Sequence, residues 1–284
     1  MIVAKTIDEC RRHRAAIGTL AFVPTMGALH AGHVSLVEHG RRHADRVALS
    51  IFVNPTQFGP KDDFHRYPRP LADDLERCRS AGVDLVFCPE VSEMYPADVP
   101  NATVDVPAIA VPLEGAHRPG HFTGVCQVVA KLFNIVQPHA ACFGEKDFQQ
   151  LAVLRAMTTA LNFPIAIVPC PTLRERDGLA MSSRNRYLSR DERTRAAAIS
   201  RSLFATAARV RAGERSATTL RLLLERDLSN GGDVSNVPVS IDYASIVDRT
   251  TLRDVAVIDA RGAQALVAMR VGSTRLIDNV RLDL

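Results

Sequence analysis

Short apolar segments alternate with helical patterns over the first 170 residues, and no other feature restricts the possible folds as strongly. The apolar segments lie at 20–23, 47–53, 84–88, 140–143 and 165–168. The segments with helical periodicity lie between them, at 33–44, 70–80, 121–136 and 147–160. Largely apolar strands that alternate with helices are typical of a parallel sheet covered by helices on both faces. We therefore expect residues 1–174 to form an α/β domain with a Rossmann-like, doubly wound parallel sheet.

The pattern changes after about residue 175. Two arginine-rich segments with helical periodicity, 190–212 and 216–229, lead to a turn predicted at 230–233. Three segments that alternate apolar and polar residues follow, at 239–247, 264–271 and 274–280. Such alternation predicts a small antiparallel sheet. We expect residues 175–284 to form a smaller α+β domain.

Composition and charge exclude several classes of protein. A chain with 46% hydrophobic and 23% charged residues is not disordered. No apolar run approaches the roughly 18 residues that span a bilayer, and Asp8 and Glu9 lie where a signal peptide needs an apolar core. The 35 basic and 31 acidic residues leave a net charge of +4, too dilute to indicate nucleic-acid binding. We expect a cytoplasmic protein with neither a membrane nor a nucleic-acid partner.

The six cysteines give no sign of a metal site or a redox motif. They form no CxxC pair and no Cys-His cluster at zinc spacing. We expect them to be small buried hydrophobic residues in a reducing compartment.

The first predicted strand runs directly into the segment PTMGALHAGH, which opens a helix. Such a turn lies where doubly wound sheets bind ligands, and the N–H groups of a helix amino terminus favour phosphate. Gly27 and Gly32 allow close approach of the backbone, while His30 and His33 could both face one anion. The alternative is that the histidines only cap the helix. Their place on a strand-turn-helix favours phosphate binding.

A second candidate segment, GEKDFQQ, follows the strand predicted at 140–143. Lys146 offers a compact positive charge for phosphate oxygens. The alternative is a solvated loop lysine. Only four of the 35 basic residues are lysines, however, so a merely solvated cation at this position would be expected to be arginine.

A third segment, Ser182-Ser183-Arg184, lies at the predicted domain junction. Two hydroxyls and a guanidinium can bind polyphosphate, although serines before an arginine also commonly cap helices. Together the three segments predict a nucleoside triphosphate held between two domains. The G-x-x-x-x-G-K-[ST] loop is absent, so the chain is not a P-loop enzyme.

Five motifs, in order along essentially the whole chain, give the sequence a family resemblance. PTMGALHxGH, NPTQF, GEKDFQQL, MSSRNRYLS and TRLIDN resemble the pantoate–β-alanine ligase family. That family belongs with the HIGH/KMSKS nucleotidyl transferases, and HxGH and MSSR correspond to the two signatures. Arg184 stands where the signature usually has a lysine, as is normal in this family.

The resemblance implies a two-step reaction. The carboxylate of (R)-pantoate attacks the α-phosphate of ATP, which gives pantoyl adenylate and pyrophosphate. The amine of β-alanine then attacks the acyl adenylate and releases pantothenate and AMP. Mg²⁺ is expected on the phosphates, with no protein ligand that the sequence names.

The resemblance also assigns roles to residues. His30, His33 and Lys146 would be catalytic, with His33 as the proton donor. The residues implied in ATP binding are Met26, Gly27, His30, His33, Gly144, Lys146, Asp147, Leu173, Met181, Ser182, Ser183 and Arg184. Gln57, Gln150 and Asn54 would bind pantoate and β-alanine, the alternative for these amides being hydrogen bonding within loops. A homodimer is implied as well.

Two other functions stay open at this point. One is a nucleotidyl transferase of the same superfamily that acts on another small acid or phosphate substrate. The other is a tRNA-binding synthetase fragment without activity. The dilute charge and the lack of any resemblance to an anticodon-binding domain disfavour the fragment.

Overall fold

The structure, a computed structural model, describes residues 1–60, 62, 64–230 and 237–284. It divides into two compact units. The first unit contains residues 1–111, 118–145 and 149–171, and the second contains 112–117, 146–148 and 172–284. The turn predicted at 230–233 lies, from residue 231 on, outside the described residues.

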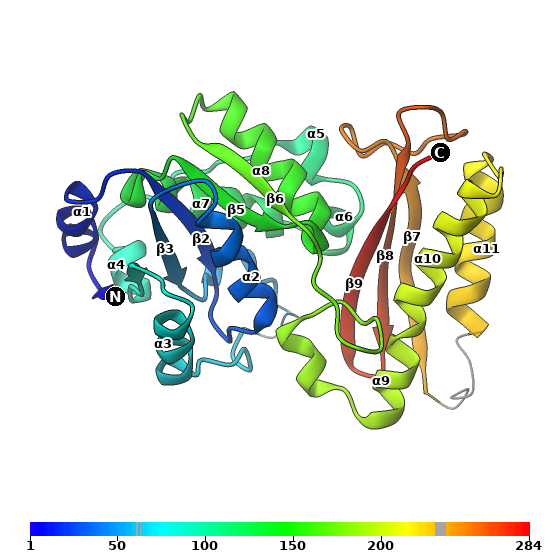
Figure 1. Cartoon of the computed structure of the whole chain (residues 1–284), viewed down its shortest axis with the longest axis horizontal. Helices are drawn as coiled ribbons and strands as arrows, with labels where there is room; N and C mark the ends of the chain where they lie inside the picture. Colours follow the sequence, from blue (N-terminus) through cyan, green and yellow to red (C-terminus); the bar gives the residue numbers. More distant parts are fainter. Residues whose placement is uncertain (61, 63, 231–236) are drawn as a thin grey trace. The chain divides into compact units, whose positions relative to one another are not determined.

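The first unit is built on a six-stranded sheet whose strand pairs are all parallel (Figure 1). Its strands are β1 (Ile2–Ala4), β2 (Leu20–Thr25), β3 (Arg46–Ile51), β4 (Leu85–Phe87), β5 (Ala140–Gly144) and β6 (Ala166–Cys170). Their order is β1-β4-β3-β2-β5-β6. The chain builds outward from β2 to one side through β3 and β4, and to the other side through β5 and β6. The predicted doubly wound sheet is therefore confirmed, with its switch point between β2 and β5.

Both faces of this sheet are buried by helices. The longer helices of the unit are α1 (Ile7–Ala15), α2 (Ala31–Gly40), α3 (Leu71–Ser80), α7 (His121–Val136) and α8 (Phe148–Ala160). Alternate residues of β2 enter different hydrophobic cores: Leu20 and Phe22 pack with residues of α7 and α8, whereas Ala21 and Val23 pack with residues of α2 and α3. Because successive strand side chains point to opposite faces, a strand buried on both sides is continuously apolar.

Short helical segments connect these elements. They are η1 (Pro55–Gln57), α4 (Val91–Met94), α5 (Pro107–Ala110), α6 (Glu114–His117) and η2 (Glu145–Asp147). Of these, α6 and residues 146–147 of η2 belong to the second unit. These segments were not predicted from the sequence, and neither were β1 and α1. β1 has only three residues, and α1 buries only Cys10, so neither leaves a periodic apolar signal.

The second unit contains an antiparallel sheet of three strands (Figure 1), as predicted. The strands are β7 (Val239–Val247), β8 (Ala263–Val271) and β9 (Thr274–Leu282). The helical segments are η3 (Ser183–Tyr187), α9 (Arg190–Ala196), α10 (Ala198–Arg211) and α11 (Ala217–Asn230). Leu203 of α10 and Leu224 of α11 pack with the strand residues Ala265 and Val267 in one core.

The single helix predicted at 190–212 is interrupted at Ala197, which separates α9 from α10. The buried Ser200 hydroxyl donates a hydrogen bond to the Ala197 carbonyl at 3.1 Å. A serine that bonds to a nearby carbonyl in this way competes with the regular helical hydrogen bonds. The periodicity predicted the helical segment at 190–212 but not this interruption.

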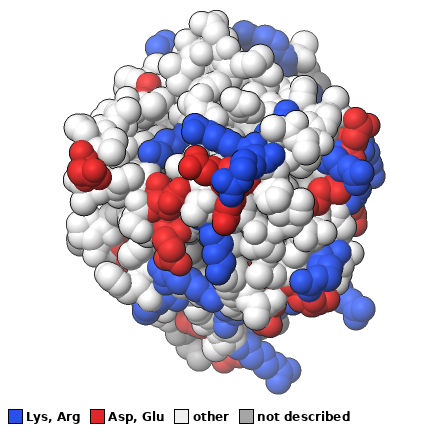
Figure 2. Space-filling model, turned by 90° about the vertical axis from the view of Figure 1, so that its left-hand side faces the viewer, with Lys and Arg blue, Asp and Glu red and all other residues white. Residues whose placement is uncertain are grey.

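Two expectations from the composition concern the charge of the surface and the lack of a membrane-spanning helix. Figure 2 shows one face of the molecule, on which lysine and arginine side chains lie among aspartate and glutamate side chains. Within the described ranges, no helix has both the length and the apolar character needed to span a bilayer.

Candidate active site

Three predicted segments begin at the carboxyl ends of neighbouring strands in the first unit. The segment that carries His30 and His33 follows β2, the Asn54–Gln57 segment follows β3, and Gly144 is the last residue of β5. β2 pairs with both β3 and β5. The carboxyl edge at the switch point is the usual ligand site of such sheets. The sheet thus brings these candidates to one edge.

A buried carboxylate holds the loop between β2 and α2. Asp74 of α3, 1% exposed, accepts hydrogen bonds from the main-chain N–H groups of Ala28 at 2.8 Å and Leu29 at 2.7 Å. The loop needs this support because Gly27 and Ala28 both have positive φ, +80° and +51°. A Cβ on Gly27 would lie 2.8 Å from Asp74 Oδ2, so only glycine fits. Asp74 was not predicted from the sequence as a residue of the site.

His30 and His33 lie at the amino end of α2, with ring centroids 4.1 Å apart. The Gly32 N–H donates to His30 Nδ1 at 3.1 Å, and the His30 N–H donates to His33 Nδ1 at 3.3 Å. A neutral imidazole has one N–H and one acceptor nitrogen. Because Nδ1 accepts in both rings, this hydrogen-bond network assigns the proton of each neutral ring to Nε2. Both histidines therefore cap the helix, which was the alternative to phosphate binding. Each ring also carries an N–H donor at Nε2.

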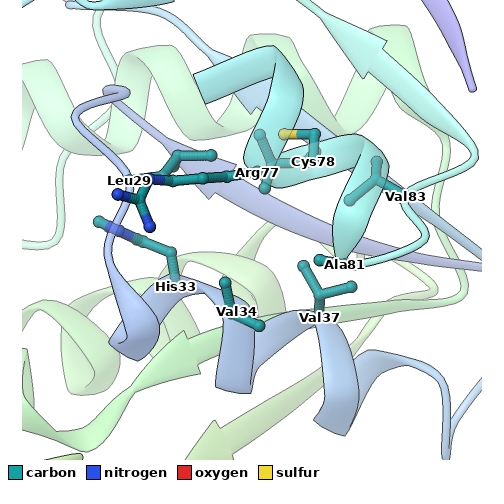
Figure 3. Close-up of a pocket in the computed structure, with 9 residues that line it drawn as sticks. Leu29, His33, Val34, Val37, Arg77, Cys78, Ala81 and Val83 are labelled. Atoms are coloured by element: carbon teal, nitrogen blue, oxygen red, sulfur yellow. The ribbon is translucent and has the colours of Figure 1, made fainter. Parts of the chain in front are cut away.

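A small pocket lies between α2 and α3. Its lining is mostly apolar, and His33 is the only predicted site residue in it. Figure 3 shows the guanidinium of Arg77 beside the His33 ring and Leu29. An apolar lining does not suit a triphosphate, so this pocket does not by itself form the predicted nucleotide site.

The Gln57 side chain is fixed by a chain of hydrogen bonds. Asn54 Nδ2 donates to Gln57 Oε1 and to the Gly124 carbonyl, both at 3.1 Å. The Tyr95 hydroxyl donates a hydrogen bond to Asn54 Oδ1 at 2.8 Å. Burial raises the pKa of this hydroxyl, which keeps it protonated as a donor. Because a main-chain carbonyl can only accept, it sets the orientation of the Asn54 amide, and Asn54 in turn sets that of Gln57. Gln57 thus has its Nε2 group away from Asn54, 3.2 Å from Met26 Sδ.

The backbone at Gln57 is held as well. His121 Nδ1 lies 2.8 Å from the Gln57 carbonyl, and His121 Nε2 lies 3.1 Å from Arg118 Nη1. A carbonyl only accepts and a guanidinium only donates, so His121 is neutral with its proton on Nδ1. Tyr95, Arg118 and His121 were not predicted from the sequence, because they are far from Gln57 in the chain and match no motif.

In the second unit, the loop between β6 and η3 joins two predicted ATP-binding residues. The Met181 N–H donates to the Leu173 carbonyl at 2.9 Å. Ser182 begins η3, and its hydroxyl accepts from the Arg184 N–H at 3.3 Å. Ser182 therefore caps η3, as the alternative to polyphosphate binding predicted. Arg184 lies in the first turn of η3, directly after the two serines.

Lys146 and Asp147 belong to η2, with Lys146 Nζ 3.8 Å from Asp147 Oδ1. Gln150 is a half-buried residue of the first turn of α8, and the part of the chain that the structure describes records no hydrogen bond from its side chain to Gln57. The structure thus supports Asn54 and Gln57 as a pair and leaves Gln150 as a separate candidate.

The parallel sheet, its switch point and the histidine-capped helix define a doubly wound α/β protein of the nucleotide-binding class. Comparison with known proteins specifies it further: the chain belongs to the pantoate–β-alanine ligase family, whose sequence model matches residues 2–281. It is thus a ligase.

Individual relatives agree over the full length. The chain is 51% identical to pantothenate synthetase 1 of Bradyrhizobium diazoefficiens over 287 aligned positions, 100% of this chain and 99% of that protein. The crystal structure of pantothenate synthetase from Thermus thermophilus superposes with a TM-score of 0.93 at 44% identity, and 100% of each chain is covered. The ligase of Francisella tularensis, solved with "beta-gamma ATP" and β-alanine, has a TM-score of 0.78 at 31% identity, with 99% of this chain and 97% of that one covered.

Proposed function

We propose that this ligase condenses (R)-pantoate with β-alanine in two steps, through a pantoyl adenylate, and releases pyrophosphate and then AMP. The observation that carries the proposal is the pair of histidines with Nε2 donors at the start of α2, beside the switch point of the sheet. The family, and the ATP and β-alanine complex of the Francisella relative, support the same substrates.

In the first step, negative charge grows on the α-phosphoryl group as the pantoate carboxylate attacks it. His30 and His33 would donate to the phosphoryl oxygens through Nε2, next to the partial positive charge of the α2 amino terminus. His33 would act as the proton donor. Asp74 would position this loop through its hydrogen bonds to the main-chain N–H groups of Ala28 and Leu29.

The remaining predicted contacts to ATP would come from residues of both units. Met26, Gly27 and Gly144 would line the nucleotide with main-chain atoms, together with Leu173, and Asp147 would lie near the ribose. Lys146, Met181, Ser182, Ser183 and Arg184 would hold the polyphosphate and the departing pyrophosphate. The domain at 175–284 would close over ATP.

Mg²⁺ would arrive on the phosphates of ATP and neutralise part of their charge. Where the structure describes the chain, no three His, Cys, Asp or Glu side chains form a group that could hold a metal ion.

Pantoate would be recognised by Gln57, with Asn54 as its support and Gln150 as a further contact. The hydrogen bonds at Asn54 leave Gln57 to act as a donor through Nε2, so it would contact a carboxylate or hydroxyl oxygen. We place the enzyme in the cytoplasm, as the composition of the sequence predicts, and expect it to be a homodimer, as the family resemblance implies.

A coupled assay for AMP tests the proposal. Purified protein with ATP, Mg²⁺, pantoate and β-alanine should release one AMP for each pantothenate formed, and omission of β-alanine should leave bound pantoyl adenylate. A superfamily nucleotidyl transferase that keeps the nucleotide in its product would release pyrophosphate without free AMP. That result would refute the ligase reaction.

A further inference from the structure

The motif TRLIDN contributes no residue to the proposed site. It lies in β9, where Asp278 and Asn279 are only 4% and 6% exposed. Buried polar side chains are kept where they form hydrogen bonds, because an unpaired one costs free energy. The partners of these two residues within the second unit indicate what the motif does.

Asn279 holds the main chain of the candidate phosphate-binding lysine. Its Nδ2 donates to the Lys146 carbonyl at 2.8 Å. Gln264 of β8 donates from Nε2 to Asn279 Oδ1 at 2.7 Å. Because the Lys146 carbonyl can only accept, it fixes the orientation of the Asn279 amide and then that of Gln264.

Asp278 holds the other candidate segment of the unit. Its two carboxylate oxygens lie 2.6 and 3.0 Å from Nη1 and Nη2 of Arg174, a bidentate ion pair. Arg174 Nη1 also donates to the Gly178 carbonyl at 3.1 Å. Arg174 directly follows Leu173, whose carbonyl accepts from Met181. Two adjacent residues of β9 therefore anchor both segments that carry the predicted polyphosphate contacts.

We propose that Asn279 is a positioning residue, which fixes the backbone of Lys146 so that its ammonium group meets the phosphates of ATP. This inference rests on the proposed function. The ammonium group can lie only as far from the main chain as the lysine stem extends, so the position of the backbone sets the region that the charge can reach. A supporting hydrogen bond then improves ATP binding without touching ATP.

The test is a double-mutant cycle on the binding of a non-hydrolysable ATP analogue, measured by calorimetry. Asn279→Leu removes the hydrogen bond to the Lys146 carbonyl together with the one from Gln264, and we expect it to weaken binding about tenfold. In the Lys146→Ala background the same substitution should change Kd less than twofold. The KM for pantoate should stay within twofold of the unsubstituted enzyme.

Two further variants keep the test decisive. Asn279→Asp retains the size of the side chain but replaces the donor with an acceptor, so it gives a second measurement if Asn279→Leu does not fold. Thr274→Val is the matched control, since Thr274 lies in the same strand, is 5% exposed and has no side-chain hydrogen bond within the described ranges. It should bind the analogue normally.

Equal weakening by Asn279→Leu in both backgrounds, or no weakening in either, would overturn the inference. An unchanged Kd in Lys146→Ala alone would refute the phosphate role of Lys146, and this inference with it. If Lys146→Ala weakened binding of the analogue while Asn279→Leu left its Kd unchanged, the positioning role of Asn279 alone would be refuted.

Discussion

A Cβ atom on Gly124 would lie 2.6 Å from the main-chain nitrogen of Gln57. The close approach of α7 to η1 therefore requires glycine at this position, and it lets the Gly124 carbonyl accept from Asn54. The helix that fills much of the first core thus also fixes the backbone of the proposed pantoate contact.

Gly124→Ala should push η1 away from α7. Overpacking of this kind costs about 1–3 kcal/mol, and we expect a lower melting temperature with a larger loss in kcat/KM for pantoate than for ATP. Gly18→Ala is the control, because its nearest neighbour would be Asp45 Oδ2 at 3.9 Å. Steady-state kinetics in which Gly124→Ala behaves like Gly18→Ala would contradict the close packing.

Gln57→Ala should weaken pantoate binding far more than ATP binding. Removal of a buried amide that faces a substrate oxygen costs on the order of 1–3 kcal/mol. Calorimetry with each ligand separately measures both effects. Equal losses for the two ligands would indicate general misfolding and not a pantoate site.

His33→Ala should slow the first half-reaction much more than the second. Phosphoryl charge develops when the adenylate forms, whereas β-alanine later attacks a carbonyl that is already activated. Loss of one well-placed donor costs about 2.7–4 kcal/mol in the transition state. Rapid-quench measurement should find almost no adenylate from ATP and pantoate, but clear product from supplied pantoyl adenylate and β-alanine. Similar losses in both halves would point to a structural role.

Asp74→Asn should release the loop that carries the histidines. The carboxylate accepts two main-chain N–H groups, and an amide would place a donor against one of them, at a cost of about 1–3 kcal/mol. We expect a lower melting temperature and slower adenylate formation. Asp73→Asn, an exposed neighbour in α3, is the matched control. Unchanged adenylate formation in Asp74→Asn would exclude this positioning role.

The buried thiols should resist alkylation at pH 8. Burial raises the pKa of Cys10 to about 11, and of Cys78 and Cys126 to about 12. A raised pKa lowers the thiolate fraction below its value for a free thiol with a pKa of about 8.5, and the thiolate is the reactive form. Mass spectrometry after iodoacetamide treatment should show slow modification in the native protein and rapid modification in urea. Rapid native modification would mean that these sites open readily.

The sequence predicted the parts of the site that are local in the chain. The turn from β2 to α2 was recognisable because glycines and histidines directly follow an apolar strand. Asp74 was not, because an acidic residue in the first turn of a helix is ordinary. Its role depends on α3 packing beside a loop 45 residues away in sequence. The roles of Tyr95 and Gly124 could not be predicted for the same reason, because only tertiary packing brings these residues to Asn54.

The hydrogen bond between Lys146 and Asn279 also constrains the order of events during synthesis. Its partners are separated by 133 positions, so a ribosome that has just made the lysine must add nearly half of the chain before the asparagine exists. Contacts between such distant residues form late in folding. The nascent protein can therefore have its central strands in place while the lysine is still unanchored, and full affinity for ATP should appear only after translation has passed the last strand.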